Sequence, residues 1–267
     1  MTSKPPVTPL PAATVTLVRD TSRGLEVLML QRNHSLRFMP GVYVFPGGGL
    51  DPADGAPELA GLCVGLEDRA ASGTLGVENG GLAYWIAAIR EAFEEAGILL
   101  AYDSTGRFVD MNGNAAARYA AHRETLDGKG NHAAFGNILR SEDLRLATDR
   151  LTYFGHWITP VTVPRRYDTR FFLAVVPEGQ QALHDGHETI ANRWLRPQEA
   201  LDERDGLGLR FPTVKTLEQF AQCDTTEQLV RELRGKRVVR PLLPRMTADG
   251  RTLLPGEPGY EEAGASS

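Results

Sequence analysis

The segment AAIREAFEEAGILL, residues 87–100, constrains this chain more than any other part of its sequence. Glu91, Glu94 and Glu95 stand at positions i, i+3 and i+4, so on an α-helix their side chains share one face. No lysine or arginine follows at the positions that would pair with them, and like charges at this spacing repel by about 0.2–0.5 kcal/mol per pair. The pattern is typical of a solvated acidic helix face or of oxygen ligands to a hard divalent cation.

The apolar residues around these glutamates predict the helix itself. They recur at spacings of three and four from Ile86 to Phe93, which is the period of one helix face. We expect the helix to cover 82–96. Asn79 is a candidate N-cap, and Gly97 suits the left-handed residue that ends a helix.

A β-rich region precedes this helix. Residues 13–19 and 25–31 are rich in β-branched and aliphatic side chains and predict a hairpin or meander. A short strand at 42–45 leads through Pro46 into the glycines Gly47–Gly49. Three glycines after a strand indicate a tight turn where the backbone comes close to another group.

Later segments alternate between strand and helix patterns, and no internal repeat interrupts them. We expect a short helix near 58–66 and two or three surface helices within 112–150. Proline-rich chain from Val238 onward should be extended. Further expected strands are 152–159, 170–176 and 190–195, and further expected helices are 197–201, 212–221 and 226–233. The whole predicts an α/β domain over 1–267, with insertions at 55–81 and about 112–150 and a C-terminal extension at about 207–267.

Composition excludes several classes of protein. The 267 residues are 42% hydrophobic and 24% charged, which is ordinary for a globular protein and excludes a disordered chain. A net charge of −5 gives no footprint for nucleic-acid binding. No apolar run is long enough for a membrane helix, and Cys63 and Cys223 lack the neighbours of a zinc site. Without a signal-peptide core or a peroxisomal address, we expect a cytoplasmic protein. A homodimer is left open.

These elements together resemble the Nudix box, whose pattern is Gly, five residues, Glu, seven residues, then Arg-Glu-apolar-any-Glu-Glu-any-Gly-apolar. Residues 90–98 match the second half at every specified position. Gly48 and Asp54 match the first half, with Asp where the family has Glu. Thirty-five residues separate Asp54 from Arg90 instead of seven, which is an insertion of 28. The usual lead-in, Phe-Pro-Gly-Gly, is present at 45–48. The resemblance implies an α/β/α sandwich around a mixed sheet, with helical insertions.

A second resemblance narrows the subfamily. Residues 37–48 read Arg, three residues, Gly, three residues, Phe-Pro-Gly-Gly, which is similar to the end of the signature of coenzyme A diphosphatases. The chain also resembles the long-insert acyl-CoA diphosphatases of animal peroxisomes. Their similarity spans 28–256 and includes 157–160, 165–172 and 253–256.

The resemblance implies a hydrolase that uses Mg²⁺ or Mn²⁺. Glu94 and Glu95 would be direct metal ligands, and Glu91 either a ligand or the group that takes the proton from attacking water. The backbone carbonyl of Gly47 would also reach the metal. Arg90 would hold the helix by pairing with a carboxylate.

Other candidates lie outside the box. Glu188, which precedes the expected strand at 190–195, is a candidate for a further acidic ligand; an exposed loop glutamate is the alternative. Arg37 is the best candidate for contact with a substrate phosphate, because a guanidinium suits phosphate geometry; an ion pair that orients its loop is the alternative. Arg165, Arg166 and Arg170 flank Asp168, and one of them could reach phosphate, with solvated arginines at strand ends as the alternative; Arg166 is the second candidate.

The implied substrate is a small nucleotide-type molecule. The favoured reaction cleaves coenzyme A or acyl-CoA to 3′,5′-ADP and (acyl-)phosphopantetheine. One alternative is a Nudix pyrophosphatase acting on ADP-ribose, dinucleotides or nucleoside triphosphates. Another is a catalytically silent nucleotide-binding regulatory module, which the intact Glu91, Glu94 and Glu95 disfavour.

Overall fold

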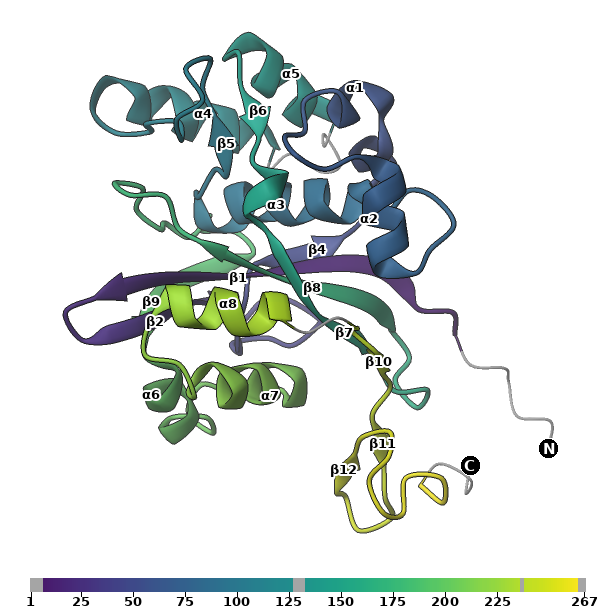
Figure 1. Cartoon of the computed structure of the whole chain (residues 1–267). Coiled ribbons are helices and arrows are strands. Elements are labelled where there is room, and N and C mark those ends of the chain that lie inside the picture. The colour runs from purple at the N-terminus through teal and green to yellow at the C-terminus, as the bar shows by residue number, and fades with distance from the viewer. Residues whose placement is uncertain (1–6, 127–132, 236–237, 264–267) are drawn as a thin grey trace.

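A mixed β-sheet forms the middle layer of the molecule, with helices against both of its faces (Figure 1). The computed structural model describes residues 7–126, 133–235 and 238–263. The sheet order is β10-β7-β8-β1-β2-β3, with β4 paired to β1 and β9 paired to β2. This arrangement confirms the expected α/β/α sandwich. The strands of the sheet are β1 (Leu10–Thr21), β2 (Gly24–Arg32), β3 (Tyr43–Val44), β4 (Gly47–Gly49), β7 (Thr152–Ile158), β8 (Tyr167–Val175), β9 (Thr189–Leu195) and β10 (Pro241–Leu242).

The long strand β1 organises the sheet. It runs parallel to β8 from Leu10 to Val18, and antiparallel to both β2 and β4. β10 also lies parallel to its neighbour β7. The predicted hairpin and the later predicted strands are therefore confirmed, within a few residues at their ends.

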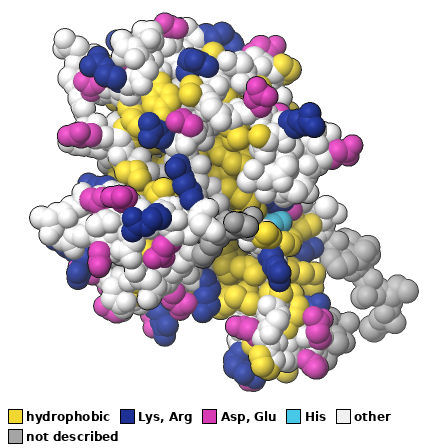
Figure 2. All heavy atoms as spheres, in the orientation of Figure 1, with side chains coloured by type: hydrophobic (Ala, Val, Ile, Leu, Met, Phe, Trp, Pro, Cys, Tyr) yellow, Lys and Arg dark blue, Asp and Glu magenta, His cyan; other side chains and the backbone are white. Residues whose placement is uncertain are grey.

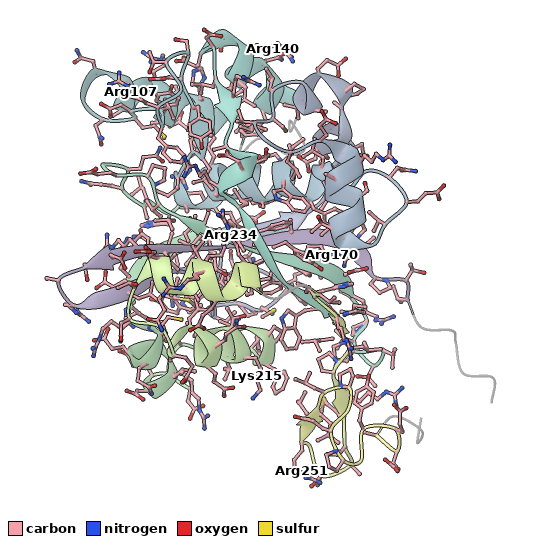
Figure 3. The ribbon with its side chains drawn as sticks, in the orientation of Figure 1. Arg107, Arg140, Arg170, Lys215, Arg234 and Arg251 are labelled. Atoms are coloured by element: carbon pink, nitrogen blue, oxygen red, sulfur yellow. The ribbon has the colours of Figure 1, made fainter. Side chains whose placement is uncertain are left out.

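Two layers of helices cover the two faces of the sheet (Figure 1). The first layer is α1 (Pro57–Ala60), α2 (Asp68–Leu75), α3 (Leu82–Ala96), α4 (Ala116–Leu126) and α5 (Ala133–Ser141), with the small pair β5 (Ala101–Tyr102) and β6 (Arg145–Leu146). The second layer is α6 (Pro197–Asp202), α7 (Phe211–Phe220) and α8 (Thr226–Gly235). In Figure 3 the labelled Arg107 and Arg140 lie in the first layer, and Lys215 lies in the second.

The helix α3 is buried on nearly every side. Val15 and Leu17 of β1 belong to the apolar core on its sheet side, and Phe135 and Leu139 of α5 belong to the same core. All residues of α3 except Tyr84 and Glu94 are buried, including the charged Arg90, Glu91 and Glu95. The two insertions therefore cover α3, and α5 is more deeply buried than the expected surface helix because its apolar stripe packs against this core.

The N-terminus of α3 corrects one prediction. Gly81, not Asn79, is the N-cap, and it offers no side chain for capping. Asp68 of α2 supplies the missing acceptors: its carboxylate accepts hydrogen bonds from the backbone N–H groups of Leu82 and Gly80, at 2.9 and 3.0 Å. These bonds lower the pKa of Asp68. Gly97 ends the helix at φ 66°, as predicted.

The first insertion differs in detail from its prediction. The expected helix near 58–66 is only the single turn α1, and α2 was not predicted. Between β4 and α1 lies a short 3₁₀ turn, η1 (Pro52–Gly55), capped by Asp51. Two further 3₁₀ turns are η2 (Gly113–Ala115) and η3 (Thr148–Arg150).

The C-terminal extension closes the molecule at one end. β10 attaches it to β7, and the hairpin strands β11 (Arg245–Met246) and β12 (Thr252–Leu253) form a small lobe beyond it (Figure 1). Both cysteines are buried and free. Among the described residues, no helix is long and apolar enough to span a bilayer.

Candidate active site

A buried arginine organises the acidic helix. Arg90 on α3 has no exposed surface, and its guanidinium donates to Glu91 at 2.8 Å and to Glu94 at 3.0 Å. It also donates to the carbonyl of Gly49 at 3.2 Å, which ties α3 to β4. The role expected for Arg90, pairing with carboxylates of its own helix, matches this geometry.

Asp54 is the strongest partner of this arginine. Its two carboxylate oxygens accept from Nε and Nη2 of Arg90 at 2.8 and 3.0 Å, and its side chain is 1% exposed. The same carboxylate accepts from the backbone N–H of Asp51, which closes η1. A bidentate pair of this kind fixes orientation as well as distance. The two halves of the predicted motif therefore meet in space despite the 35 residues between them.

The glycine strand β4 lets the backbone approach the glutamates. A Cβ at Gly48 would lie 2.5 Å from a carboxylate oxygen of Glu91, and a Cβ at Gly47 would lie 2.5 Å from the carbonyl oxygen of Ala13. The N–H of Gly47 donates to Glu95 at 2.9 Å. Gly47 and Gly48 are thus required by close packing against β1 and α3, as the sequence indicated for this turn.

Burial shifts the protonation of these carboxyls. It raises the pKa of Glu91 to about 7 and that of Glu94 to about 7, although Arg90 pulls both values down. The pKa of Glu95 is raised well above its usual value by burial and by the negative charge of Glu91. The single guanidinium of Arg90 pairs with Asp54, Glu91 and Glu94. When these carboxyls are ionised, negative charge exceeds positive charge, so an added cation would stabilise the cluster.

The donor set fits a hard divalent ion. Glu91, Glu94 and Glu95 offer only carboxylate oxygens, and all three line one cleft. Among the described residues, no three acidic, histidine or cysteine side chains already stand as a formed metal cage. The glutamates are turned instead to Arg90 and to the N–H of Gly47.

Glu188 lies at the same cleft, as a ligand from a late loop would have to. Asp185 shapes this loop, because its carboxylate accepts from the backbone N–H groups of Glu188 and Thr189. Glu188 is exposed and lines the cleft, and its negative charge raises the pKa of Glu94 and Glu95. The sequence indicated Glu188 but gave no signal for Asp185.

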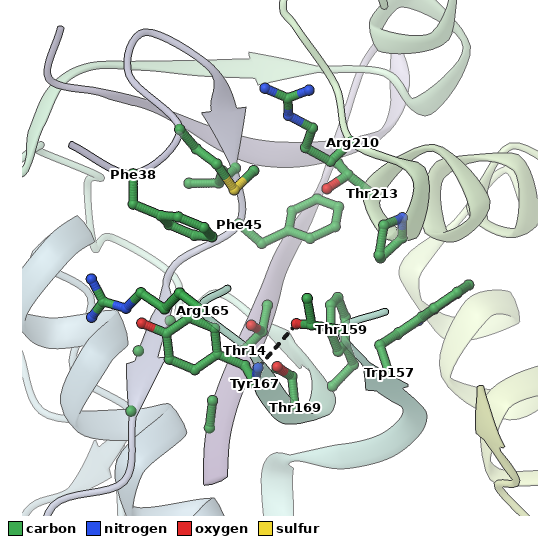
Figure 4. A pocket seen from close by; sticks show the side chains of 18 of the residues that line it. Thr14, Phe38, Phe45, Trp157, Thr159, Arg165, Tyr167, Thr169, Arg210 and Thr213 are labelled. Atoms are coloured by element: carbon green, nitrogen blue, oxygen red, sulfur yellow. Dashed lines mark hydrogen bonds between the residues drawn. The ribbon is translucent and has the colours of Figure 1, made fainter. Parts of the chain in front are cut away.

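The cleft has a volume of about 1160 Å³ and two unlike ends. One end holds the carboxylates and the glycine strand. The other is an apolar wall, in which the rings of Trp157 and Phe211 lie 6.1 Å apart. Figure 4 shows Trp157 across the cleft from Phe38 and Arg165. The apolar wall consists of Trp157, Ile158, Pro160, Val163, Leu209, Phe211, Pro212, Pro244 and Met246.

Three arginines line the cleft: Arg32, Arg165 and Arg210. The guanidinium of Arg165 lies 5.7 Å from the ring centre of Phe38 and 5.4 Å from that of Tyr167, and Figure 4 shows it beside both rings. Arg32 donates to the carbonyl of Phe38, and its positive charge offsets a small part of the rise in the pKa of Glu95. Arg165 was weighed from the sequence, whereas Arg32 and Arg210 were missed because one ends a strand and the other precedes a helix without any motif.

The two arginines predicted to bind substrate do not line this cleft. Arg37 is exposed and lies outside its lining. Arg166 is buried and donates to the backbone carbonyls of Thr159 and Val7, at 3.0 and 2.7 Å. Its guanidinium therefore fastens the start of β8 to the segment before β1, so its assignment to substrate is corrected to a structural role.

The comparisons with known proteins agree with this geometry. Residues 66–206 match the family model described as the NUDT19 Nudix domain, which is more than half of the chain. The chain belongs to the Nudix hydrolase family. Human acyl-coenzyme A diphosphatase NUDT19 is 30% identical, with the alignment covering 98% of this chain and 76% of the human protein. The protein of the same name from Xenopus laevis is 26% identical, covering 91% and 73%.

A solved structure supports the same fold. The crystal structure of a NUDIX hydrolase from Alicyclobacillus acidocaldarius aligns with a TM-score of 0.69 and 27% identity, over 84% of this chain and 96% of that one. As a Nudix hydrolase, the chain is an enzyme for small nucleotide substrates, and hydrolases of this family generally use divalent metal ions. The matched region begins at Leu66, inside the first insertion, so it includes residues 66–81 of that insertion and the acidic helix α3.

Proposed function

We propose that this Nudix hydrolase cleaves the diphosphate of coenzyme A and acyl-CoA, releasing 3′,5′-ADP and (acyl-)phosphopantetheine. Water adds to one phosphorus and the bridging P–O bond breaks. Two animal relatives whose alignments cover nearly the full length of this chain are named acyl-coenzyme A diphosphatase.

One observation carries the proposal: a single cleft joins a carboxylate cluster to a long apolar wall. A diphosphate needs the charged end, and a nucleoside triphosphate would leave the apolar wall without a partner. Acyl-CoA has a diphosphate near its nucleotide and an apolar chain at its far end, so it matches both. This match favours coenzyme A substrates over the smaller ones.

The metal would be Mg²⁺ or Mn²⁺, held by Glu91, Glu94 and Glu95, with Glu188 and the carbonyl of Gly47 as further donors. When bound, it would offset the charge of the diphosphate and orient the reacting oxygens. Glu91 would serve either as a ligand or as the group that takes the proton from the attacking water. Arg90 would hold Glu91 and Glu94 in place, since its guanidinium is fully buried.

The test is a substrate panel with product identification by mass. The purified protein is incubated with Mg²⁺ and, separately, coenzyme A, dodecanoyl-CoA, ADP-ribose, a dinucleoside polyphosphate and dATP. We expect 3′,5′-ADP from the two coenzyme A substrates, faster than products from the others. Faster turnover of another diphosphate would overturn the substrate, and no turnover with either Mg²⁺ or Mn²⁺ would favour a silent binding module. The cytoplasmic location and the homodimer stay predictions.

A further inference from the structure

The C-terminal segment contributes residues to the cleft that no sequence pattern predicted. Pro244, Met246 and Thr252 line the cleft although they lie about 150 residues after the glutamates of α3. β10 brings them there, because Leu242 pairs with Trp157 of β7. Figure 2 shows hydrophobic side chains gathered where the lobe of this segment meets the body of the molecule.

The lobe has a fixed shape. Arg245 donates to the carbonyl of Tyr260 at 2.9 Å and to the carboxylate of Glu261 at 3.0 Å, and its guanidinium lies 4.3 Å from the centre of the Tyr260 ring. The hydroxyl of Tyr260 donates to the carbonyl of Leu243 at 2.7 Å. These contacts fix the shape of the hairpin, and the pairing of β10 with β7 attaches it beside the cleft that Met246 lines.

The two arginines of the lobe are paired with its own carboxylates. Arg245 is paired with Glu261, and Arg251 is paired with Asp249 at 2.8 Å. Both arginines therefore have partners within the lobe, and neither lines the cleft. The lobe contributes the apolar Pro244 and Met246 to the cleft lining. The arginines that face the cleft near the carboxylates, Arg32 and Arg165, suit the phosphates.

Met246 is suited to contact an apolar chain. Met246 is 56% exposed, so it is not part of the hydrophobic core. A thioether side chain with three rotatable bonds adapts to partners of different shape. Trp157 and Phe211, whose rings lie 6.1 Å apart, line the same cleft.

We propose that Pro244 and Met246 of the C-terminal lobe form the outer wall of the subsite for the acyl end of acyl-CoA, so that the lobe sets the preference for chain length. This inference rests on the proposed function. It assigns the acyl groove to the extension after α8. The two insertions before it cover α3 instead, and of their described residues only Leu126 lines the cleft.

The experiment compares Met246→Glu with two controls. Val238→Glu makes the same charge change at a 74% exposed position of the same segment that does not line the cleft, and Met246→Leu keeps the apolar contact. For each protein, kcat/KM is measured with coenzyme A, octanoyl-CoA and dodecanoyl-CoA below their micelle concentrations. The melting temperature checks folding, which an exposed side chain should leave unchanged.

We expect kcat/KM of the unaltered protein to rise about tenfold from coenzyme A to dodecanoyl-CoA, because added methylenes are buried against the wall. Met246→Glu should remove that rise and change coenzyme A less than about twofold, while both controls keep it. Equal loss with coenzyme A and dodecanoyl-CoA, or no dependence on chain length in the unaltered protein, overturns the inference. Failure to form 3′,5′-ADP from any coenzyme A substrate would instead overturn the proposed function.

Discussion

The two ends of the cleft are built in different ways. At the carboxylate end, Arg90 and Asp54 are almost fully buried and joined by directed hydrogen bonds at 2.8 and 3.0 Å. At the apolar end, Met246 is half exposed and the wall is assembled from three separate parts of the chain. Directed charge pairs fix geometry to within tenths of an ångström, whereas apolar contact depends mainly on area. The chemistry is therefore held rigidly, and the binding wall is free to vary.

The largest expected effect comes from breaking the rigid end. Arg90→Met leaves the buried carboxylate of Asp54 without its partner, so the free energy of unfolding should fall by about 3–5 kcal/mol. Urea unfolding followed by circular dichroism measures it. The control Lys215→Met removes an exposed pair with Glu218, and should change stability by less than about 1 kcal/mol. Equal effects of the two variants would mean that the buried network does not stabilise the fold.

The next effect concerns chemistry at the same end. Glu94→Gln keeps the size of the side chain and removes one charge from the proposed metal site. Turnover of coenzyme A should fall about 100-fold at saturating Mg²⁺, since charge stabilisation at a reacting group contributes a few kcal/mol. The melting temperature should change little. Undiminished turnover would contradict the metal role of Glu94.

The pH dependence of stability tests the carboxylate end of the cleft alone, and its measurement needs no substrate. Burial raises the pKa of Glu91 and of Glu94 to about 7, so the folded protein binds these protons more tightly than the unfolded chain. In EDTA, stability should therefore be complete below about pH 4.5 and decline as pH rises through 7, by about 3 kcal/mol for each group. Added Mg²⁺ should restore part of this loss at pH 8.

Urea unfolding at pH 5 and pH 8 measures this decline, with Glu91→Gln as the matched variant. Other groups titrate over the same interval, so the difference between the variant and the unaltered protein isolates Glu91. We expect a smaller decline in the variant. The same decline in both proteins would contradict the raised pKa of Glu91.

The smallest effect tests the arginines between the two ends. Arg165→Gln should raise the KM for coenzyme A about tenfold, as expected for one charge-assisted contact to phosphate. Arg37→Ala, at an exposed position outside the cleft lining, should raise it less than twofold. Dephospho-coenzyme A then shows which phosphate is involved: a smaller effect of Arg165→Gln on this substrate assigns Arg165 to the 3′-phosphate. A larger effect of Arg37→Ala would restore the role first expected for Arg37.

Much of the carboxylate end could be predicted from the sequence. The three glutamates, Arg90 and the helix end at Gly97 follow from spacing within one helix, where neighbours three and four residues apart decide the pattern. The N-cap prediction failed because Asp68, from another helix, satisfies the backbone that Asn79 was expected to cap. The helix expected near 58–66 ends at Ala60, and the residues after it pair with β6 instead, where the N–H of Val64 donates to the carbonyl of Leu146.

The apolar end of the cleft could hardly be predicted from the sequence. Trp157, Phe211 and Met246 come from a strand, a helix start and a hairpin, each unremarkable in its own segment. Arg166 illustrates the converse: it stands within a motif of basic residues, yet its guanidinium holds backbone carbonyls. Side-chain direction at such positions depends on strand register, which the local sequence does not fix.

The sequence by itself determined the elements, the acidic helix face and the family resemblance, because helix periodicity, glycine conformations and a spaced motif are encoded by near neighbours. Only the tertiary structure decided that Asp54 meets Arg90, that the loop of Glu188 returns to α3, and that the C-terminal lobe completes the cleft. Those contacts join residues far apart in the chain. The fold as a whole brings these residues together, so their separation along the chain follows no fixed spacing that the sequence alone would reveal.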